Sequence, residues 1–103
     1  MMNILFVCSR NKWRSKTAET IFKNYNNINV RSAGTSNVAK TKISMDLIKW
    51  ADKIYVMEKN HKNIIEKKFG RINKEISILN IPDEYQYMDE ELIDELKSVV
   101  KIL

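Results

Sequence analysis

The chain has 103 residues, of which 44% are hydrophobic and 30% are charged. This length predicts a single domain over residues 1–103, and the hydrophobic content argues against a disordered chain. One cysteine excludes an internal disulfide, and no apolar run is long enough to cross a membrane. Residues 1–10 lack the features of a signal peptide, so we expect a cytoplasmic protein.

The charge balance is basic, with 18 lysines and arginines against 13 acidic residues and a net charge of +5. A positive surface favours anionic partners. The last stretch, residues 83–103, is acidic, so the positive charge is concentrated in the rest of the chain.

The first half of the chain alternates strand and helix patterns. Residues 3–7 predict a strand that is apolar on both faces, which is typical of the centre of a parallel sheet. Ser15 is placed to cap a helix whose apolar face contains Ala18, Ile21, Phe22 and Tyr25. Residues 29–33 predict a second strand closed by Gly34, residues 36–42 a loop, and residues 43–51 a short helix.

The second half continues the alternation. Residues 53–57 predict a third strand, and residues 58–69 a helix with Ile64, Ile65 and Phe69 inward and His61 exposed. Residues 76–79 predict a fourth strand, and residues 80–88 a loop. Residues 89–103 predict the last helix, whose apolar stripe is Leu92, Ile93, Leu96, Val99, Val100 and Leu103.

This order predicts an α/β fold, a three-layer sandwich with a four-stranded parallel sheet. Ligands of such sheets bind beyond the carboxyl ends of the strands. Cys8 ends the first strand and Asp83 follows the fourth, so both can reach the same edge.

The pattern Cys8-x5-Arg14-Ser15 at a strand-to-helix junction predicts a phosphate cradle around a sulfur nucleophile. Unpaired N–H groups and the positive dipole end of the helix favour an anion there. Arg14 can bind two phosphate oxygens, and the same positive field favours the thiolate of Cys8. A lone cysteine is more often a small buried hydrophobe, but Arg-Ser at this offset favours the nucleophile.

These residues resemble the low-molecular-weight protein tyrosine phosphatases. The resemblance rests on Val7-Cys8-x5-Arg14-Ser15 with Ala18-Glu19, then on residues 31–35 and 51–57 with Asn60. It implies that fold, with Cys8 as the nucleophile and Arg14 as the phosphoryl ligand. No metal is expected, because no second cysteine or histidine has ligand spacing, and no other cofactor is expected. The loop would supply backbone N–H groups, with Asn11 in an unusual backbone conformation. Ser15 would form a hydrogen bond to the Cys8 sulfur. The residues that the resemblance assigns to phosphate binding are Ser9, Arg10, Asn11, Lys12, Trp13, Arg14 and Ser15.

The chain departs from the family pattern at three points. Arg10 replaces the usual glycine, and Lys16 replaces the usual proline. In the late loop the chain has Pro82-Asp83 where the family usually has Asp-Pro. We expect Asp83 to be the general acid, with Asp89 as the alternative; Asp89 can instead cap the last helix.

Aromatic and basic residues near the loop allow two interpretations each. Trp13 either forms a wall against a substrate ring or covers the edge of the core, and Tyr85 and Tyr87 either form the other wall or contact the core. Arg10 and Lys12 either extend the positive field or are ordinary solvated residues.

The sequence therefore predicts a phosphomonoesterase that acts on aryl phosphate, such as phosphotyrosine, through a phosphocysteine. Expected partners are a phosphorylated protein or a small aryl phosphate. Nucleic acid is not favoured, no membrane is expected, and no oligomeric state is assigned. The alternatives are a phosphocysteine phosphocarrier of the sugar phosphotransferase type, an arsenate reductase that uses an external thiol, and a non-catalytic module that binds phosphate or nucleic acid.

Overall fold

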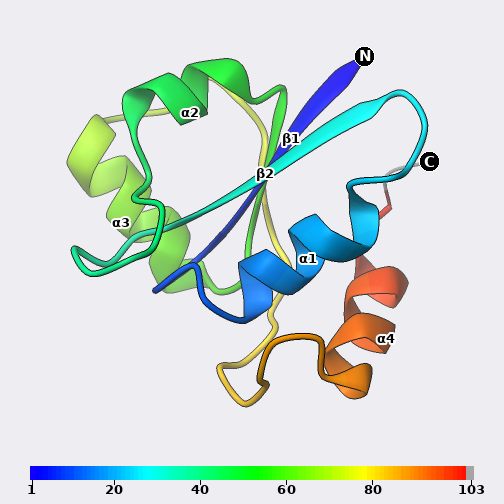
Figure 1. The fold of residues 1–103 in the computed structure, drawn as a ribbon. Helices are drawn as coiled ribbons and strands as arrows, with labels where there is room; N and C mark the ends of the chain where they lie inside the picture. Colours follow the sequence, from blue (N-terminus) through cyan, green and yellow to red (C-terminus); the bar gives the residue numbers. More distant parts are fainter. Residues whose placement is uncertain (102–103) are drawn as a thin grey trace.

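The structure is a computed structural model that describes residues 1–101. Within this range four parallel strands form one sheet in the order β2-β1-β3-β4 (Figure 1). The strands are β1 Met2–Cys8, β2 Ile28–Gly34, β3 Lys53–Val56 and β4 Ile76–Ile78.

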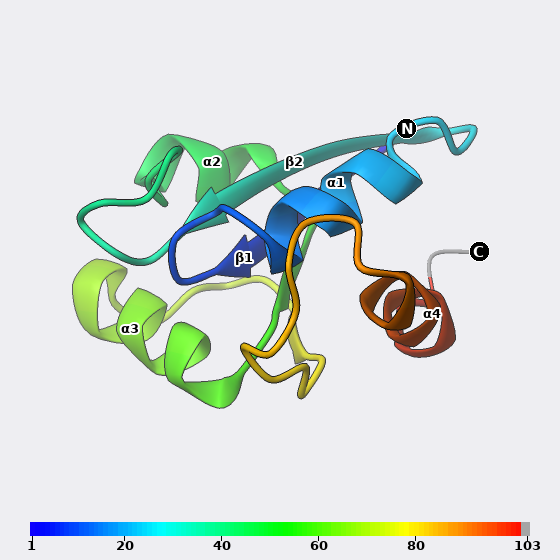
Figure 2. The same cartoon turned by 60° about the horizontal axis from the view of Figure 1, so that its bottom comes forward.

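Helices cover both faces of this sheet. Helices α1 (Arg14–Phe22) and α4 (Glu90–Val99) lie on one face, and α2 (Met45–Trp50) and α3 (Lys59–Phe69) lie on the other (Figure 2). The predicted three-layer α/β sandwich is thus confirmed. No helix within residues 1–101 is both long enough and apolar enough to span a membrane.

Strand β1 lies at the centre, and its residues from Ile4 to Cys8 are apolar and buried because both of its faces are covered there. Ile4 and Phe6 pack toward α1 and α4, whereas Leu5 and Val7 pack toward α2 and α3. All four side chains are fully buried, as expected for a central parallel strand. The strand therefore delivers Cys8, its last residue, to a fixed position at the carboxyl edge of the sheet.

Some predicted element boundaries are wrong. Helix α1 begins at Arg14, and Ser15 lies inside its first turn without capping it. The last helix ends at Val99, where the chain becomes extended at Val100. Val100 is buried, as the predicted stripe required, whereas Val99 is exposed, contrary to that stripe. Leu103, also assigned to that stripe, lies outside the described residues.

Gly34 ends β2 where the chain passes very close to the loop that follows β1. A Cβ atom at this position would lie 2.4 Å from the Ser9 carbonyl oxygen and 2.9 Å from the Asn11 nitrogen. Backbone bonds join the two segments nearby, from Thr35 N to Cys8 O (2.9 Å) and from Ser36 N to Ser9 O (2.8 Å). The absence of a side chain at Gly34 lets the β2 end support this loop.

We expect Gly34→Ala to destabilise the fold by about 1–3 kcal/mol, the usual cost of overpacking, because its close neighbours include backbone atoms. The variant should also bind inorganic phosphate more weakly, since the loop must shift. Urea denaturation and phosphate titration measure the two effects.

Gly70→Ala is a suitable control. A Cβ there meets nothing within 4 Å, but the φ of +81° strains any other residue, so stability falls. Its phosphate affinity should not change. Equal losses of phosphate affinity in both variants would contradict the proposed role of Gly34.

Candidate active site

The segment from Cys8, the last residue of β1, to Ser15, in the first turn of α1, is called loop 8–15 below. Its sharp turn depends on Asn11, which is fully buried and has a φ of 54°. Asparagine tolerates this left-handed conformation better than most residues. The other residues of the loop have negative φ angles, so Arg10 fits at the position where the resemblance led us to expect glycine.

The sulfur of Cys8 is held by a chain of polar contacts inside the loop. The Asn11 side-chain nitrogen donates to Ser15 Oγ at 2.8 Å, and Ser15 Oγ lies 3.0 Å from Cys8 Sγ. Because Ser15 Oγ already accepts one bond, its hydroxyl proton is free to point at the sulfur. Ser15 thus lies where the resemblance implied, and this contact, not helix capping, occupies its side chain.

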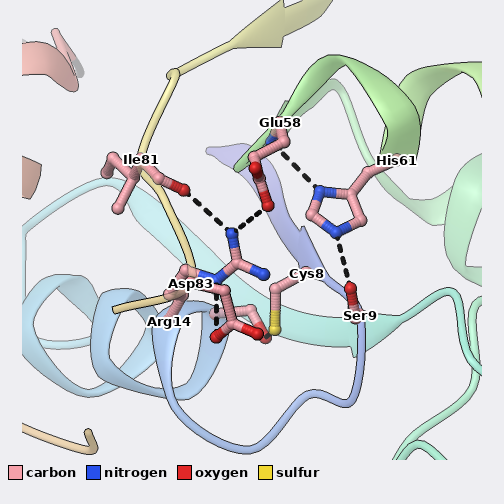
Figure 3. Close-up of polar contacts among 8 residues, drawn as sticks. Cys8, Ser9, Arg14, Glu58, His61, Ile81 and Asp83 are labelled. Carbon is pink, nitrogen blue, oxygen red and sulfur yellow. Dashed lines mark hydrogen bonds and ion pairs between the residues drawn. The ribbon is translucent and has the colours of Figure 1, made fainter. Parts of the chain in front are cut away.

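Arg14 brings a buried positive charge next to Cys8 (Figure 3). Its side chain is only 2% exposed, and its Nη1 donates to Glu58 Oε1 at 2.6 Å and to the Ile81 carbonyl at 2.8 Å. These bonds fix the plane of the guanidinium from two separate segments. Within residues 1–101 the other two nitrogens make no hydrogen bond, although Nε lies 3.7 Å from Asp83 Oδ1, so the guanidinium can still donate to an anion beside the sulfur.

Two residues that sequence reasoning missed support the loop from the start of α3. Glu58 is the N-cap of α3, and its backbone N–H donates to His61 Nδ1 at 3.0 Å. Since Nδ1 accepts this bond, the proton of the neutral ring is on Nε2, which lies 2.9 Å from Ser9 Oγ. Glu58 therefore holds Arg14 while His61 holds Ser9.

His61 is fully buried, and the expectation that it would be exposed was wrong. It faces loop 8–15 because it sits in the first turn of a helix that begins at the carboxyl edge of the sheet. Burial first, and the charge of Arg14 second, lower the pKa of His61 from 6.5 to about 4. The ring is therefore neutral near pH 7. The Glu58–His61 spacing could have indicated a capped helix start, but it does not indicate that either side chain contacts loop 8–15.

Asp83 and Asp89, the two candidates for a general acid, occupy different environments. Asp83 lies in the segment after β4, with Oδ1 at 3.7 Å from Arg14 Nε, and 60% of its side chain is exposed. Asp89 Oδ1 accepts from the Glu91 N–H at 3.0 Å and caps α4. Of the two, only Asp83 lines the cavity at Cys8.

The cavity at Cys8 measures about 70 Å³, comparable with the volume of two or three water molecules and suited to one small anion. Cys8 and Arg14 lie on its wall together with Asp83. The remaining wall residues come from loop 8–15 and are Ser9, Arg10, Lys12 and Trp13. The structure thus brings most of the predicted phosphate-binding residues around one space, while Asn11 and Ser15 support it from the buried side.

The three aromatic residues that were candidates for the walls of the substrate site lie in different surroundings. Trp13 is 36% exposed and lines the cavity, whereas Tyr85 packs against the core and donates its hydroxyl to Glu95 Oε2 at 3.0 Å. Tyr87 is half-exposed, with its hydroxyl 2.9 Å from Thr20 Oγ1. In Figure 2 the segment after β4 passes beside α1, and Tyr87 contacts Thr20 of that helix without lining the cavity at Cys8.

Comparison with known proteins identifies relatives of this architecture. The family described as low molecular weight phosphotyrosine protein phosphatase matches residues 3–48, which include loop 8–15. A protein-arginine-phosphatase of Bacillus subtilis (strain 168) is 30% identical over 105 residues, covering 76% of this chain and 70% of that protein.

Two further relatives extend over most of the chain. The crystal structure of a YwlE mutant from Bacillus subtilis has a TM-score of 0.75 at 26% identity, covering 96% of this chain and 93% of that one. The low molecular weight protein-tyrosine-phosphatase Ptp of Acinetobacter johnsonii is 31% identical over 130 residues, covering 96% of this chain and 90% of that protein. The matches thus cover loop 8–15 together with the rest of the fold, and the chain belongs to the low molecular weight phosphotyrosine protein phosphatase family.

Proposed function

We propose that this protein is a phosphomonoesterase that hydrolyses an aryl phosphate of the phosphotyrosine type through a phosphocysteine at Cys8. The observation that carries the proposal is one small cavity lined by the Cys8 sulfur, the buried Arg14 and the exposed carboxyl group of Asp83. A nucleophile, an anion clamp and a proton donor for one phosphoryl group thus share one site.

In the first step the Cys8 thiolate attacks phosphorus in line with the leaving oxygen. The S–P bond forms as the P–O bond to the aryl group breaks, and Asp83 gives its proton to the leaving oxygen. Arg14 and the N–H groups of loop 8–15 stabilise the negative charge on the equatorial oxygens. The hydroxyl of Ser15, 3.0 Å from the sulfur, stabilises the thiolate before attack and after release.

In the second step water attacks the phosphocysteine. Asp83, now a carboxylate, accepts a proton from this water, the S–P bond breaks, and inorganic phosphate and the thiolate are released. No residue changes oxidation state. The exposed position of Asp83 lets it serve both the leaving group and water.

Phosphoarginine is the second candidate substrate, because a relative that is 30% identical is named a protein-arginine-phosphatase. The cradle would hold the same phosphoryl group, and the leaving atom would be nitrogen instead of oxygen. Matched peptides that carry phosphotyrosine or phosphoarginine distinguish the two substrates through kcat/KM.

We further propose a cytoplasmic location, where a free cysteine stays reduced.

The first prediction from the proposed function tests the nucleophile. Wild type should hydrolyse p-nitrophenyl phosphate in EDTA, and Cys8→Ser should lose turnover while still binding phosphate, because the cradle remains. Rate measurements and phosphate titration check both parts. Wild-type activity in the variant would exclude a phosphocysteine, and a wild type that binds phosphate without any turnover would favour a non-catalytic module.

The second prediction separates the two carboxylates. Asp83→Asn should slow hydrolysis of phosphotyrosine by about 10²–10⁴-fold, and p-nitrophenyl phosphate much less, because a good leaving group needs little protonation. Asp89→Asn should cost about 1 kcal/mol of stability or less, since asparagine also caps helices. If the loss that depends on the leaving group appears only in Asp89→Asn, the assignment is reversed.

The third prediction concerns His61. Its pKa of about 4 in the folded protein lies below the ordinary 6.5, so the unfolded chain binds more protons between these values. Stability should therefore fall as pH drops, and His61 should contribute about 2 kcal/mol of this loss between pH 7 and pH 5. His61→Gln should lack this part of the pH dependence in urea denaturation.

Ser9→Ala is the control for that experiment. This variant removes the hydrogen bond between Ser9 Oγ and His61 Nε2 but keeps the buried imidazole. Its stability should therefore fall, while the pH dependence of stability should stay as steep as in the wild type. A wild-type pH profile in His61→Gln would show that His61 is not buried in its neutral form.

A further inference from the structure

A second, larger cavity opens beside the catalytic one. It has a volume of about 490 Å³ and lies along α1, and we call it the lysine groove. Lys12 and Trp13 line both this groove and the cavity at Cys8. Whatever is attached to a phosphoryl group in the cavity can therefore continue into the groove.

The groove carries an excess of positive charge. Four of its lining residues are lysines, namely Lys12, Lys16, Lys23 and Lys40. The one carboxylate in the lining is Glu19, whose Oε1 already accepts from Ser32 Oγ at 2.5 Å and lies 3.3 Å from Lys16 Nζ. Within residues 1–101, no carboxylate lies within 4.0 Å of the other three ammonium groups.

We propose that the lysine groove binds an acidic segment of a protein substrate that adjoins the phosphorylated residue. This inference rests on the proposed function and adds a substrate class to it. Carboxylates of the substrate would pair with the lysines of the groove, three of which have no acidic partner within residues 1–101.

The spacing of the lysines suits a polypeptide. Lys16 and Lys23 are seven residues apart on one side of α1, which corresponds to about 10 Å along the axis at 1.5 Å per residue. An extended peptide advances about 3.3 Å per residue, so acidic residues three positions apart span a similar distance. Lys40 faces the same groove from the loop after β2, and its backbone N–H donates to the Arg10 carbonyl at 3.1 Å.

The aromatic residues of the groove favour a peptide over a nucleic acid. Binding of single strands normally relies on open aromatic faces on which bases stack. Here the Lys12 ammonium lies 5.2 Å from the centre of the Trp13 ring. The Tyr87 hydroxyl is bonded to Thr20, which ties that ring to α1. A stacking base would have to displace these contacts, whereas carboxylates would not.

The test uses phosphotyrosine peptides of one length with acidic, neutral or basic flanks. Wild type should prefer the acidic peptide over the neutral one by about 10-fold in kcat/KM, mainly through KM, and raised salt should weaken the preference. Lys23→Glu/Lys40→Glu should lose this preference or invert it. Neither side chain touches the phosphoryl site, so turnover of p-nitrophenyl phosphate should not change.

Lys49→Glu/Lys67→Glu is the matched control. Both lysines are exposed on the helices of the opposite face, and the double change alters the net charge by the same amount. This control should keep the preference for acidic peptides. An equal loss in both double variants would attribute the preference to bulk charge, and a wild type without any preference would overturn the proposal directly.

Binding measurements separate this proposal from the proposed function. Isothermal titration of Cys8→Ser with the acidic and neutral phosphopeptides tests the groove even if the wild type shows no turnover. Tighter binding of the acidic peptide, lost in the groove variant, supports the proposal. Binding of a single-stranded oligonucleotide that depends on Lys23 and Lys40, with no difference between the peptides, would assign the groove to nucleic acid and overturn it.

Discussion

The buried guanidinium of Arg14 is the constraint on which the rest of the site depends. A positive charge that is 2% exposed must be balanced, because an unpaired buried charge is strongly destabilising. Glu58 and the Ile81 carbonyl provide this balance without occupying the space beside the sulfur. Because Glu58 is 40% exposed, the ion pair retains contact with water, and its main effect is to orient the guanidinium.

These contacts make the candidate site a product of three chain segments. Loop 8–15 supplies the sulfur and the arginine, the start of α3 supplies Glu58 and His61, and the segment after β4 supplies Ile81 and Asp83. The three meet because the strands before them are parallel and end at the same edge of the sheet. Gly34 adds a fourth support by allowing β2 to approach the loop backbone.

The departures from the family pattern are compatible with this arrangement. Arg10 is exposed and has a negative φ, so the backbone there does not require glycine. Lys16 stands in the first turn of α1, where proline is tolerated but not required, and its side chain instead lines the lysine groove. These replacements leave the cradle intact and add positive charge around its opening.

Much of the fold and the centre of the site could be predicted from the sequence. The alternation of strands and helices follows from hydrophobic periodicity, because burial on one or both faces of an element sets which of its residues are apolar, as in the apolar residues Ile4, Leu5, Phe6 and Val7 of β1. The pattern from Cys8 to Ser15 is equally local. Its residues are neighbours in sequence, so the spacing alone brings sulfur, guanidinium and hydroxyl together.

The tertiary structure alone decided the rest. His61 reads as a surface residue of α3, and only the position of that helix against loop 8–15 buries it beside Ser9. Glu58 likewise meets Arg14 across 44 residues of chain. The sequence left Asp83 and Asp89 as alternatives, and the path of the chain after β4 separates them by bringing one to the cavity and the other to a helix N-terminus. Contacts between distant segments depend on how elements pack, and no local pattern of residue types records that packing.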